Sequence, residues 1–446
     1  MRPATSRETL DLIKKESVNA ELSLLSIASF IGFILYAVTP YWFYNQSITL
    51  LSVILGVWIF TFLLIIPSKI QSYLSNRVNI ALFVLICFWI PYVFILRLVG
   101  FSTSDWGNFF VYALFWFSYV AFCFYNGVLN VKNKMIIILA IIMIYAFNAI
   151  DNMRLLLLYP NGNKLINFYD VYKQYNIGGT TFAFELSLCA LICQLLMLNQ
   201  TKYKKIVFGA YTINLIYLFA FSGKMTSIVL FICASLAMLI TWKINNFKKN
   251  ERILLFIGFI ITLLLSLFFL PYIFRLFGDS VASHDLSNRF YSLANFLEKM
   301  YTGNLVIDEY LVRIDLAKLS LETFISSPIF GIGKHFANQQ MYGLNAVYSV
   351  GIGSHSELID HLAVYGIVGL VSYLFIFKKY FVTLLYKCTT TINRDLYKII
   401  IAFVVFYSIL NNSFSMGVGI LLFIMLPFVL DIIEEGIKSN ASNNKA

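Results

Sequence analysis

The residue types best suited to chemistry gather between Ser327 and Leu370, where the chain reads SPIFGIGKHFANQQMYGLNAVYSVGIGSHSELIDHLAVYGIVGL. This stretch holds three of the four histidines and runs from a polar segment directly into an apolar one. His355 follows the flexible run Gly351-Ile352-Gly353, and we expect Ser354 to cap a helix that begins at His355. A histidine in that setting can take a proton from a hydroxyl group near neutral pH, or it can simply hydrogen-bond a polar headgroup.

Two carboxylates, Glu357 and Asp360, follow His355 within two turns of the predicted helix, and His361 comes directly after them. Carboxylates at the edge of a membrane are costly and usually functional, although these can also face water. We therefore treat Glu357 and Asp360 as candidates to orient His355 or to hold polar groups of a substrate.

Two arginines, Arg289 and Arg313, each lie near the start of a predicted amphipathic helix, on its polar side. The apolar faces of the two helices consist of Phe290, Leu293, Phe296, Leu297 and Met300, and of Ile314, Ala317, Leu321, Phe324 and Ile325. Such helices lie on a membrane or cap a cavity. A guanidinium group binds phosphate with two parallel hydrogen bonds, so either arginine is a candidate phosphate ligand. The alternative is an arginine that only faces water.

Four glycines near His355 suggest close backbone contacts. Gly331 and Gly333 follow the second amphipathic helix, which ends at Pro328, so they predict a tight turn and, beyond that, a close backbone approach to an anion. Gly366 and Gly369 form a stripe of small residues with Ser372, which predicts close helix packing.

Charges at two further places point to a polar cavity at the same side. Glu185 lies a few residues into an apolar run, and Lys224 lies in the very short turn FSGKMTS.

Asp308-Glu309 is the adjacent acidic pair of the long polar segment, which is weak support for a divalent metal, and we expect no metal and no cofactor. The six cysteines are spread over apolar runs and one basic connector, which favours neither disulfides nor a zinc site.

The elements that position these residues follow from composition. The chain has 446 residues, of which 60% are hydrophobic and only 12% charged, and its mean hydropathy is +0.79. These values indicate an all-α polytopic membrane protein. Its first twenty or so residues are polar, so we expect no cleaved signal sequence. We predict about twelve spans: 22–40, 48–67, 78–96, 108–126, 135–150, 179–198, 206–222, 226–242, 253–273, 361–377, 398–412 and 416–434.

Most of the 33 lysines and arginines lie in alternate connectors, such as KYKK and KKNER. The positive-inside rule then places both termini in the cytoplasm and leaves one large outer loop at about 274–360, within a single membrane domain that covers 1–446. The net charge of +11 is thereby explained by topology, with anionic lipid rather than nucleic acid as the expected partner.

The order of these motifs resembles the superfamily of O-antigen polymerases and O-antigen ligases. The resemblance rests on Arg313, then Pro328-Ile329-Phe330-Gly331-Ile332-Gly333, then His355-Ser356-Glu357 with Asp360, and then Tyr365-Gly366-Ile367-Val368-Gly369. The turn at Lys224 is similar to a basic turn of the family, although the family usually has arginine there. Ligases more often have asparagine after the histidine, so Ser356 favours a polymerase.

The resemblance implies glycosyl transfer on the outer face of the bacterial inner membrane. Donor and acceptor would both be glycans on undecaprenyl pyrophosphate, and a chain-length regulator and a flippase would act beside the enzyme. In that reading His355 is the base, Arg289, Arg313 and Lys224 bind pyrophosphate, and Glu357, Asp360 and Glu185 orient the acceptor or the base. A ligase of the same superfamily is the nearest alternative. A flippase or other transporter is a different class, which the long outer loop and the lack of an internal repeat disfavour.

Overall fold

The computed structural model describes residues 129–158, 180–199, 203–222, 224–244, 308–331, 356–411, 413 and 415–443, with single residues near 28–95 and parts of 271–298. All regular structure in these ranges is helical, as predicted. Four of the helices are long and apolar enough to cross a membrane, or five if one bent pair counts as a span. The number of about twelve is therefore not confirmed, and the spans predicted at 22–40, 48–67, 78–96, 108–126 and 253–273 lie outside the described residues.

The remaining predicted spans overlap helices whose bounds differ from the predicted ones by up to ten residues. They are α6 (Val131–Leu158), α8 (Thr180–Asn199), α9 (Lys204–Ala220), α10 (Met225–Ile244), α14 (Glu357–Lys387) and α15 (Thr391–Leu410), followed by the last span in three parts. The short turn around Lys224 does separate two helices. Residues 155–158, whose apolar run is too short to cross a membrane alone, simply continue α6.

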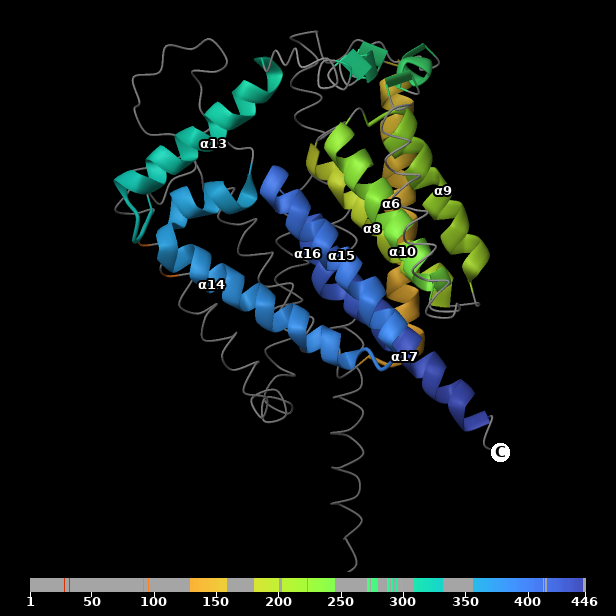
Figure 1. The fold of residues 1–446 in the computed structure, drawn as a ribbon. Helices are drawn as coiled ribbons and strands as arrows, with labels where there is room; N and C mark the ends of the chain where they lie inside the picture. Colours follow the sequence, from red (N-terminus) through yellow and green to blue (C-terminus); the bar gives the residue numbers. More distant parts are fainter. Residues whose placement is uncertain are drawn as a thin grey trace, which may run out of the picture.

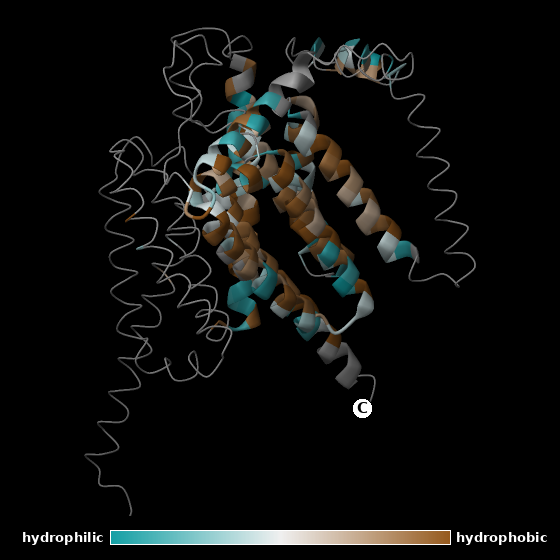
Figure 2. Ribbon diagram, turned by 60° about the vertical axis from the view of Figure 1, so that its left-hand side comes forward, coloured by the Kyte–Doolittle hydropathy of each residue, from teal (hydrophilic) through white to brown (hydrophobic). Residues whose placement is uncertain are grey.

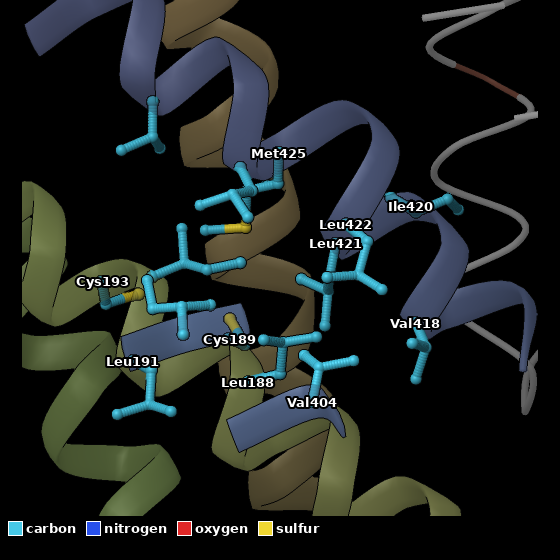
Figure 3. Close-up of a cluster of buried hydrophobic side chains, with 14 of the residues drawn as sticks. Leu188, Cys189, Leu191, Cys193, Val404, Val418, Ile420, Leu421, Leu422 and Met425 are labelled. Carbon is cyan, nitrogen blue, oxygen red and sulfur yellow. The ribbon is translucent and has the colours of Figure 1, made fainter. Parts of the chain in front are cut away.

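Helix α8 lies at the centre of the described helices, and its sequence explains why. Every residue from Phe182 to Leu196 is buried, and a helix that is apolar on all sides is stable only when other helices surround it. The ring of Phe184 stacks on Tyr407 of α15 with 3.8 Å between the centroids. Figure 3 shows Leu188 and Cys189 of α8 in the same cluster as Val404 of α15 and Leu421.

The last predicted span consists of α16 (Met416–Ile420), the π-helix η3 (Leu421–Met425) and α17 (Leu426–Asn443). A π-helical turn shifts the backbone hydrogen-bond pattern by one residue, so it changes which carbonyl groups are available to side chains. In η3 the carbonyl oxygen of Leu422 accepts a hydrogen bond from the hydroxyl of Tyr380. This contact joins η3 to α14.

Helix α14 is bent by 59° between the parts Glu357–Val371 and Tyr373–Lys387. In Figure 1 its N-terminal part lies beside α13 (Asp308–Ser326), and its C-terminal part runs along the other helices. The second predicted amphipathic helix is therefore present as α13. Only single residues of the first are described, and among them Phe290 is buried against Phe274 and Phe277.

The face of α13 that packs on α14 differs from the predicted apolar face. Leu316, Ser320 and Thr323 are buried, whereas Leu321 and Ile325 are exposed. One contact with α14 is the hydrogen bond from the Ser320 hydroxyl to Asp360 at the start of α14. Exposed Leu321 and Ile325 suit a helix that lies at a membrane surface.

Hydrophobic residues fill the middle of the helices and hydrophilic ones gather towards their ends (Figure 2). At one end, Asp431 of α17 binds Lys134 of α6 at 2.6 Å and Lys387 of α14 at 3.4 Å. One carboxylate thus pairs with lysines from two different helices. The candidate site lies at the opposite end.

Candidate active site

The first turn of α14 is fixed by reciprocal contacts between Ser356 and the residues that follow it. The Ser356 hydroxyl accepts a hydrogen bond from the backbone N–H of Ile359 at 3.4 Å, which makes Ser356 the N-cap. In return, its own N–H donates to Asp360 Oδ2 at 3.2 Å. The predicted cap at Ser354 is thus wrong by two residues, because Asp360 stabilises the chain at Ser356. His355, which precedes Ser356, lies outside the described residues.

Asp360 also joins α14 to α13. Its second carboxylate oxygen, Oδ1, accepts a hydrogen bond from the Ser320 hydroxyl at 2.6 Å. Both residues are buried, and each carboxylate oxygen of Asp360 has a protein donor. This arrangement is suited to holding the two helices together at the start of α14.

Two glycines allow the residues that follow α13 to pack closely against the backbone of α14 around Gly366. Gly331 and Gly366 have φ angles of 70° and 65°, in the region that favours glycine. A Cβ atom on Gly331 would overlap the Val364 carbonyl group, and one on Gly366 would overlap the carbonyl group of Ile329. The predicted turn at Gly331 and close packing at Gly366 are therefore both present, but as one interlocked contact.

The interlock also satisfies backbone groups that the bend would leave unpaired. At Gly366 the backbone leaves the helical conformation, with ψ at −169°, which breaks the pattern of hydrogen bonds within α14. The N–H groups of Ile367 and Val368 instead donate to the carbonyl oxygens of Pro328 at 2.9 Å and Ile329 at 3.2 Å. Gly369 is buried in the next turn, and Gly333 lies outside the described residues.

Glu357 binds the segment that connects α15 to α16. Its Oε2 accepts a hydrogen bond from the backbone N–H of Ser413 at 3.1 Å, and its own N–H donates to the carbonyl oxygen of Asn411 at 3.3 Å. Glu357 is buried. The connecting segment, residues 411–415 with the sequence NNSFS, thereby contacts the first residue of α14 through Asn411 and Ser413.

Glu185 reaches the same connecting segment from α8. Its carboxylate accepts hydrogen bonds from the Ser415 hydroxyl and, at 3.2 Å, from the hydroxyl of Tyr145 on α6. The side chain is only 8% exposed and fits against Gly417, where a Cβ atom would overlap the carboxylate. The sequence pointed to a polar environment for Glu185, and the structure surrounds it with protein hydroxyl groups.

Lys224 lies between α9 and α10 at this same end of the helices. It precedes Ser227 by one turn, and the Ser227 hydroxyl donates to Tyr407 near the end of α15 at 3.3 Å. Tyr407 in turn donates to the carbonyl oxygen of Thr180 at the start of α8 at 3.0 Å. The helix termini that carry Lys224, Glu185 and Glu357 are thus brought together, although their side chains are not in one cluster.

The arginines are less completely described. Arg313 belongs to α13, seven residues before Ser320. Seven residues are about two turns of helix, so the two positions lie on the same side of α13. Arg289 lies outside the described residues.

A small apolar cavity of about 70 Å³ lies next to Glu357 and the connecting segment. Its lining includes Leu358 and Phe377 of α14, Ser408 of α15, Ser413 and Leu422. An apolar cavity of this size can hold a small alkyl group. The polar groups of Glu357 and Ser413 lie beside it.

Sequence reasoning missed several residues of the site, namely Tyr145, Ser320, Asn411, Ser413 and Ser415. One available signal was the run NNSFS, which places four polar residues between two apolar spans. A connector this short and polar must satisfy its groups within the protein or in water. Among the residues that the structure describes, no three His, Cys, Asp or Glu side chains are close enough to hold a metal ion.

Comparison with curated proteins finds no match for this chain. A family model does match: the model described as O-antigen ligase aligns with residues 210–374, a range that includes Lys224, Arg313, Glu357 and Gly366. The matched range contains α13, the bend of α14 and the first turn of α14, which together form most of the site described above. Over this range, which is less than half of the chain, the protein is similar to the O-antigen ligase family.

Proposed function

We propose that the protein is a membrane glycosyltransferase that polymerises oligosaccharide repeat units into O-antigen or capsular polysaccharide. Donor and acceptor are glycans linked to undecaprenyl pyrophosphate, and the reaction takes place at the outer face of the bacterial inner membrane. The family match supports a membrane enzyme that transfers glycans. The observation that carries the proposal is the buried polar framework at one end of an apolar helix bundle, with Asp360 and Glu357 holding the turn that follows His355.

In the proposed reaction, a hydroxyl group of the acceptor sugar attacks the anomeric carbon of the donor. The new C–O bond forms as the bond from that carbon to the pyrophosphate oxygen breaks, and undecaprenyl pyrophosphate leaves with the bonding electrons. The hydroxyl proton passes to the imidazole of His355, acting as general base. Pyrophosphate is already a good leaving group, so the protein must neutralise its charge rather than protonate it.

Arg313, Arg289 and Lys224 are the groups proposed to neutralise the pyrophosphate. The position of Arg313 supports this role, because it shares a side of α13 with Ser320, which binds Asp360 beside the start of α14. A phosphate held there would lie near the acceptor-activating histidine. No resident metal or cofactor is part of this proposal.

Glu357, Asp360 and Glu185 are proposed to orient the base and the acceptor. For Asp360 the structure favours orientation of the base, since both of its carboxylate oxygens already accept hydrogen bonds from serine groups. Gly331 and Gly366 allow the backbone contacts that hold this region together, and we propose that Gly333 and Gly369 belong to the same structural motif.

The proposed arrangement in the membrane places both termini in the cytoplasm and the large loop at 274–360 outside, within one domain that spans 1–446. A flippase would deliver the repeat units, and a chain-length regulator would limit their number. The ligase alternative keeps the same site and donor but uses a different acceptor, and the matched model's own description is the observation that favours it.

The decisive test uses His355→Gln and His355→Ala in a strain that lacks the native gene, with surface glycan length and carrier-bound products as readouts. Glutamine keeps the hydrogen-bonding capacity but is no base near neutral pH. We expect both variants to lose roughly 10²–10⁴-fold in transfer rate. Normal chain length in His355→Gln would refute the general-base role. Loss of polymerisation leaves glycans one repeat long, whereas loss of a ligase leaves long chains on the carrier lipid, so the accumulated product separates the two functions.

The general-base role of His355 also predicts how the transfer rate depends on pH. Only neutral imidazole accepts a proton, so the wild-type rate should fall as the pH drops and His355 becomes protonated. The residual rate of His355→Gln should lack this decline.

A further inference from the structure

Two buried carboxylates from different helices bind one short connecting segment. Glu357 of α14 accepts a hydrogen bond from Ser413, and Glu185 of α8 accepts one from Ser415, only two residues later. Four of the residues from 411 to 415 are polar, while both neighbouring helices are apolar. The segment is therefore a polar link between the centre of the helix bundle and the start of α14.

The three residues of the segment that the structure describes, Asn411, Ser413 and Ser415, each form hydrogen bonds with neighbouring elements. The N–H of Asn411 donates to the carbonyl oxygen of Tyr407 at 2.8 Å, which ties the segment to the end of α15. The Ser415 hydroxyl accepts from the N–H of Val418 at 3.0 Å and so caps α16. Between them, the hydroxyl groups of Ser408 and Ser413 are 2.7 Å apart. Ser413 and Ser415, which are two residues apart, are therefore each held by contacts within the protein.

Glu185 itself has little room to move. Tyr145 donates to one carboxylate oxygen, Ser415 donates to the other, and Gly417 leaves no gap beside them. Placing a carboxyl group among apolar helices is costly, and such groups are usually retained for function. Because Glu185 is enclosed by protein, its function must act through the groups that it binds.

We propose that Glu185 is a positioning residue that sets the location of Glu357, and with it the first turn of α14, through Ser415 and the connecting segment. The inference rests on the proposed function, in which that turn presents His355 to the acceptor. Tyr145 and Gly417 complete the arrangement, the first by fixing the carboxylate and the second by making room for it.

Gly417→Ala tests this by displacing Glu185, with Gly209→Ala as the matched control because a Cβ atom there meets nothing within 4 Å. Ser415→Ala removes the donor to Glu185, while Ser415→Thr keeps both the hydroxyl group and the cap. Ser187→Ala is a second control, since that buried hydroxyl on α8 bonds only to its own helix at Ala183. Purified full-length variants in nanodiscs are assayed with a lipid-linked repeat unit.

We expect Gly417→Ala and Ser415→Ala to lower the rate at saturating donor by roughly 10–100-fold, because a misplaced reacting group is costly. The KM for the donor should stay within about twofold in both variants, since the pyrophosphate ligands lie on other elements. Ser415→Thr and the two control variants should keep at least half of the wild-type rate. Equal rates for Gly417→Ala and Gly209→Ala would overturn the inference.

A comparison in the His355→Ala background shows whether the effect passes through the first turn of α14. If Glu185 acts by positioning that turn, Gly417→Ala adds nothing once His355 is absent. An additional loss of the same 10–100-fold would instead mean that Glu185 acts elsewhere, and would contradict the inference.

A readout without activity separates this inference from the proposed function. Hydrogen exchange of a peptide spanning 356–362 should be faster in Gly417→Ala than in Gly209→Ala, because the first turn of α14 loses its support. Unchanged exchange would refute the positioning role even if His355 is the base. Faster exchange together with normal transfer by His355→Ala would retain the link and refute the general-base role of His355 in the proposed function.

Discussion

The contact between Gly331 and Gly366 makes a strong prediction, because it joins two motifs that are 35 residues apart in sequence. In Gly366→Ala, an alanine would have to adopt a φ of 65° and a ψ of −169°, a conformation that is essentially restricted to glycine. Its Cβ atom would also overlap the Ile329 carbonyl group. We therefore expect the end of α13 to separate from the bend of α14.

The magnitude follows from the interactions that would be lost. Backbone strain at such a residue costs about 1–3 kcal/mol. The hydrogen bonds from Ile367 and Val368 to the 328–329 carbonyl groups contribute about 0.5–1.5 kcal/mol each. The free energy that holds the contact closed should thus fall by about 2–6 kcal/mol. Since 1.4 kcal/mol is tenfold, local opening should become at least roughly 30-fold more frequent.

Hydrogen exchange of peptides covering 364–370 in nanodiscs measures this opening directly. Gly331→Ala should show the same acceleration, because its Cβ atom would meet Val364 from the other side. Gly209→Ala should leave exchange unchanged. If Gly366→Ala exchanged at the wild-type rate in 364–370, then the interlock would not stabilise the bend and our account of the two glycine motifs would be refuted.

Three further predictions test other contacts. Arg313→Ala should lower the rate of glycan transfer by roughly 10²-fold at normal protein levels. Arg313→Lys should restore little activity, because a lysine lacks the paired donors of a guanidinium group. Full chain length in Arg313→Ala would exclude the pyrophosphate role. Ser320→Ala and Asp360→Asn should be non-additive in thermal unfolding, with a coupling of about 1–3 kcal/mol, and additive effects would show that this hydrogen bond does not hold α13 to α14. Cysteines introduced at Ser283 and Asn338 should react with an impermeant thiol reagent on cells whose outer membrane is permeabilised but whose inner membrane is intact, and labelling only after lysis would contradict the predicted topology.

Helix positions in the described part of the chain were largely predictable, because long apolar runs such as that of α8 have no stable alternative to a buried or membrane-spanning helix. Details at helix ends were not. The cap of α14 is Ser356 rather than Ser354, because Asp360 reaches back to the Ser356 N–H. The non-helical backbone at Gly366 was predicted only as close packing, since a glycine in an apolar span does not reveal whether the backbone continues as a helix.

The candidate site was likewise predictable in its residue types but not in its contacts. The residue types and their order around Arg313, Gly331, Glu357 and Asp360 were enough to indicate the superfamily, and the family match agrees. Local sequence patterns indicate the chemistry of a site because each side chain by itself provides a base, a carboxylate or a guanidinium group. Which carboxylate contacts which hydroxyl group is decided by distant segments, and those become neighbours only when the helices pack.

The sequence by itself indicated a helical membrane protein in which a polar segment that contains His355 directly precedes an apolar span. The reason is that a helix must have a long run of apolar residues to cross a bilayer. Only the tertiary structure decided that Glu357 binds the connector between α15 and α16, that Glu185 reaches the same connector, and that two glycines interlock α13 with α14. The physical reason is that buried polar groups and bent helices must find partners for their hydrogen bonds. Those partners come from whichever elements the packing brings within reach.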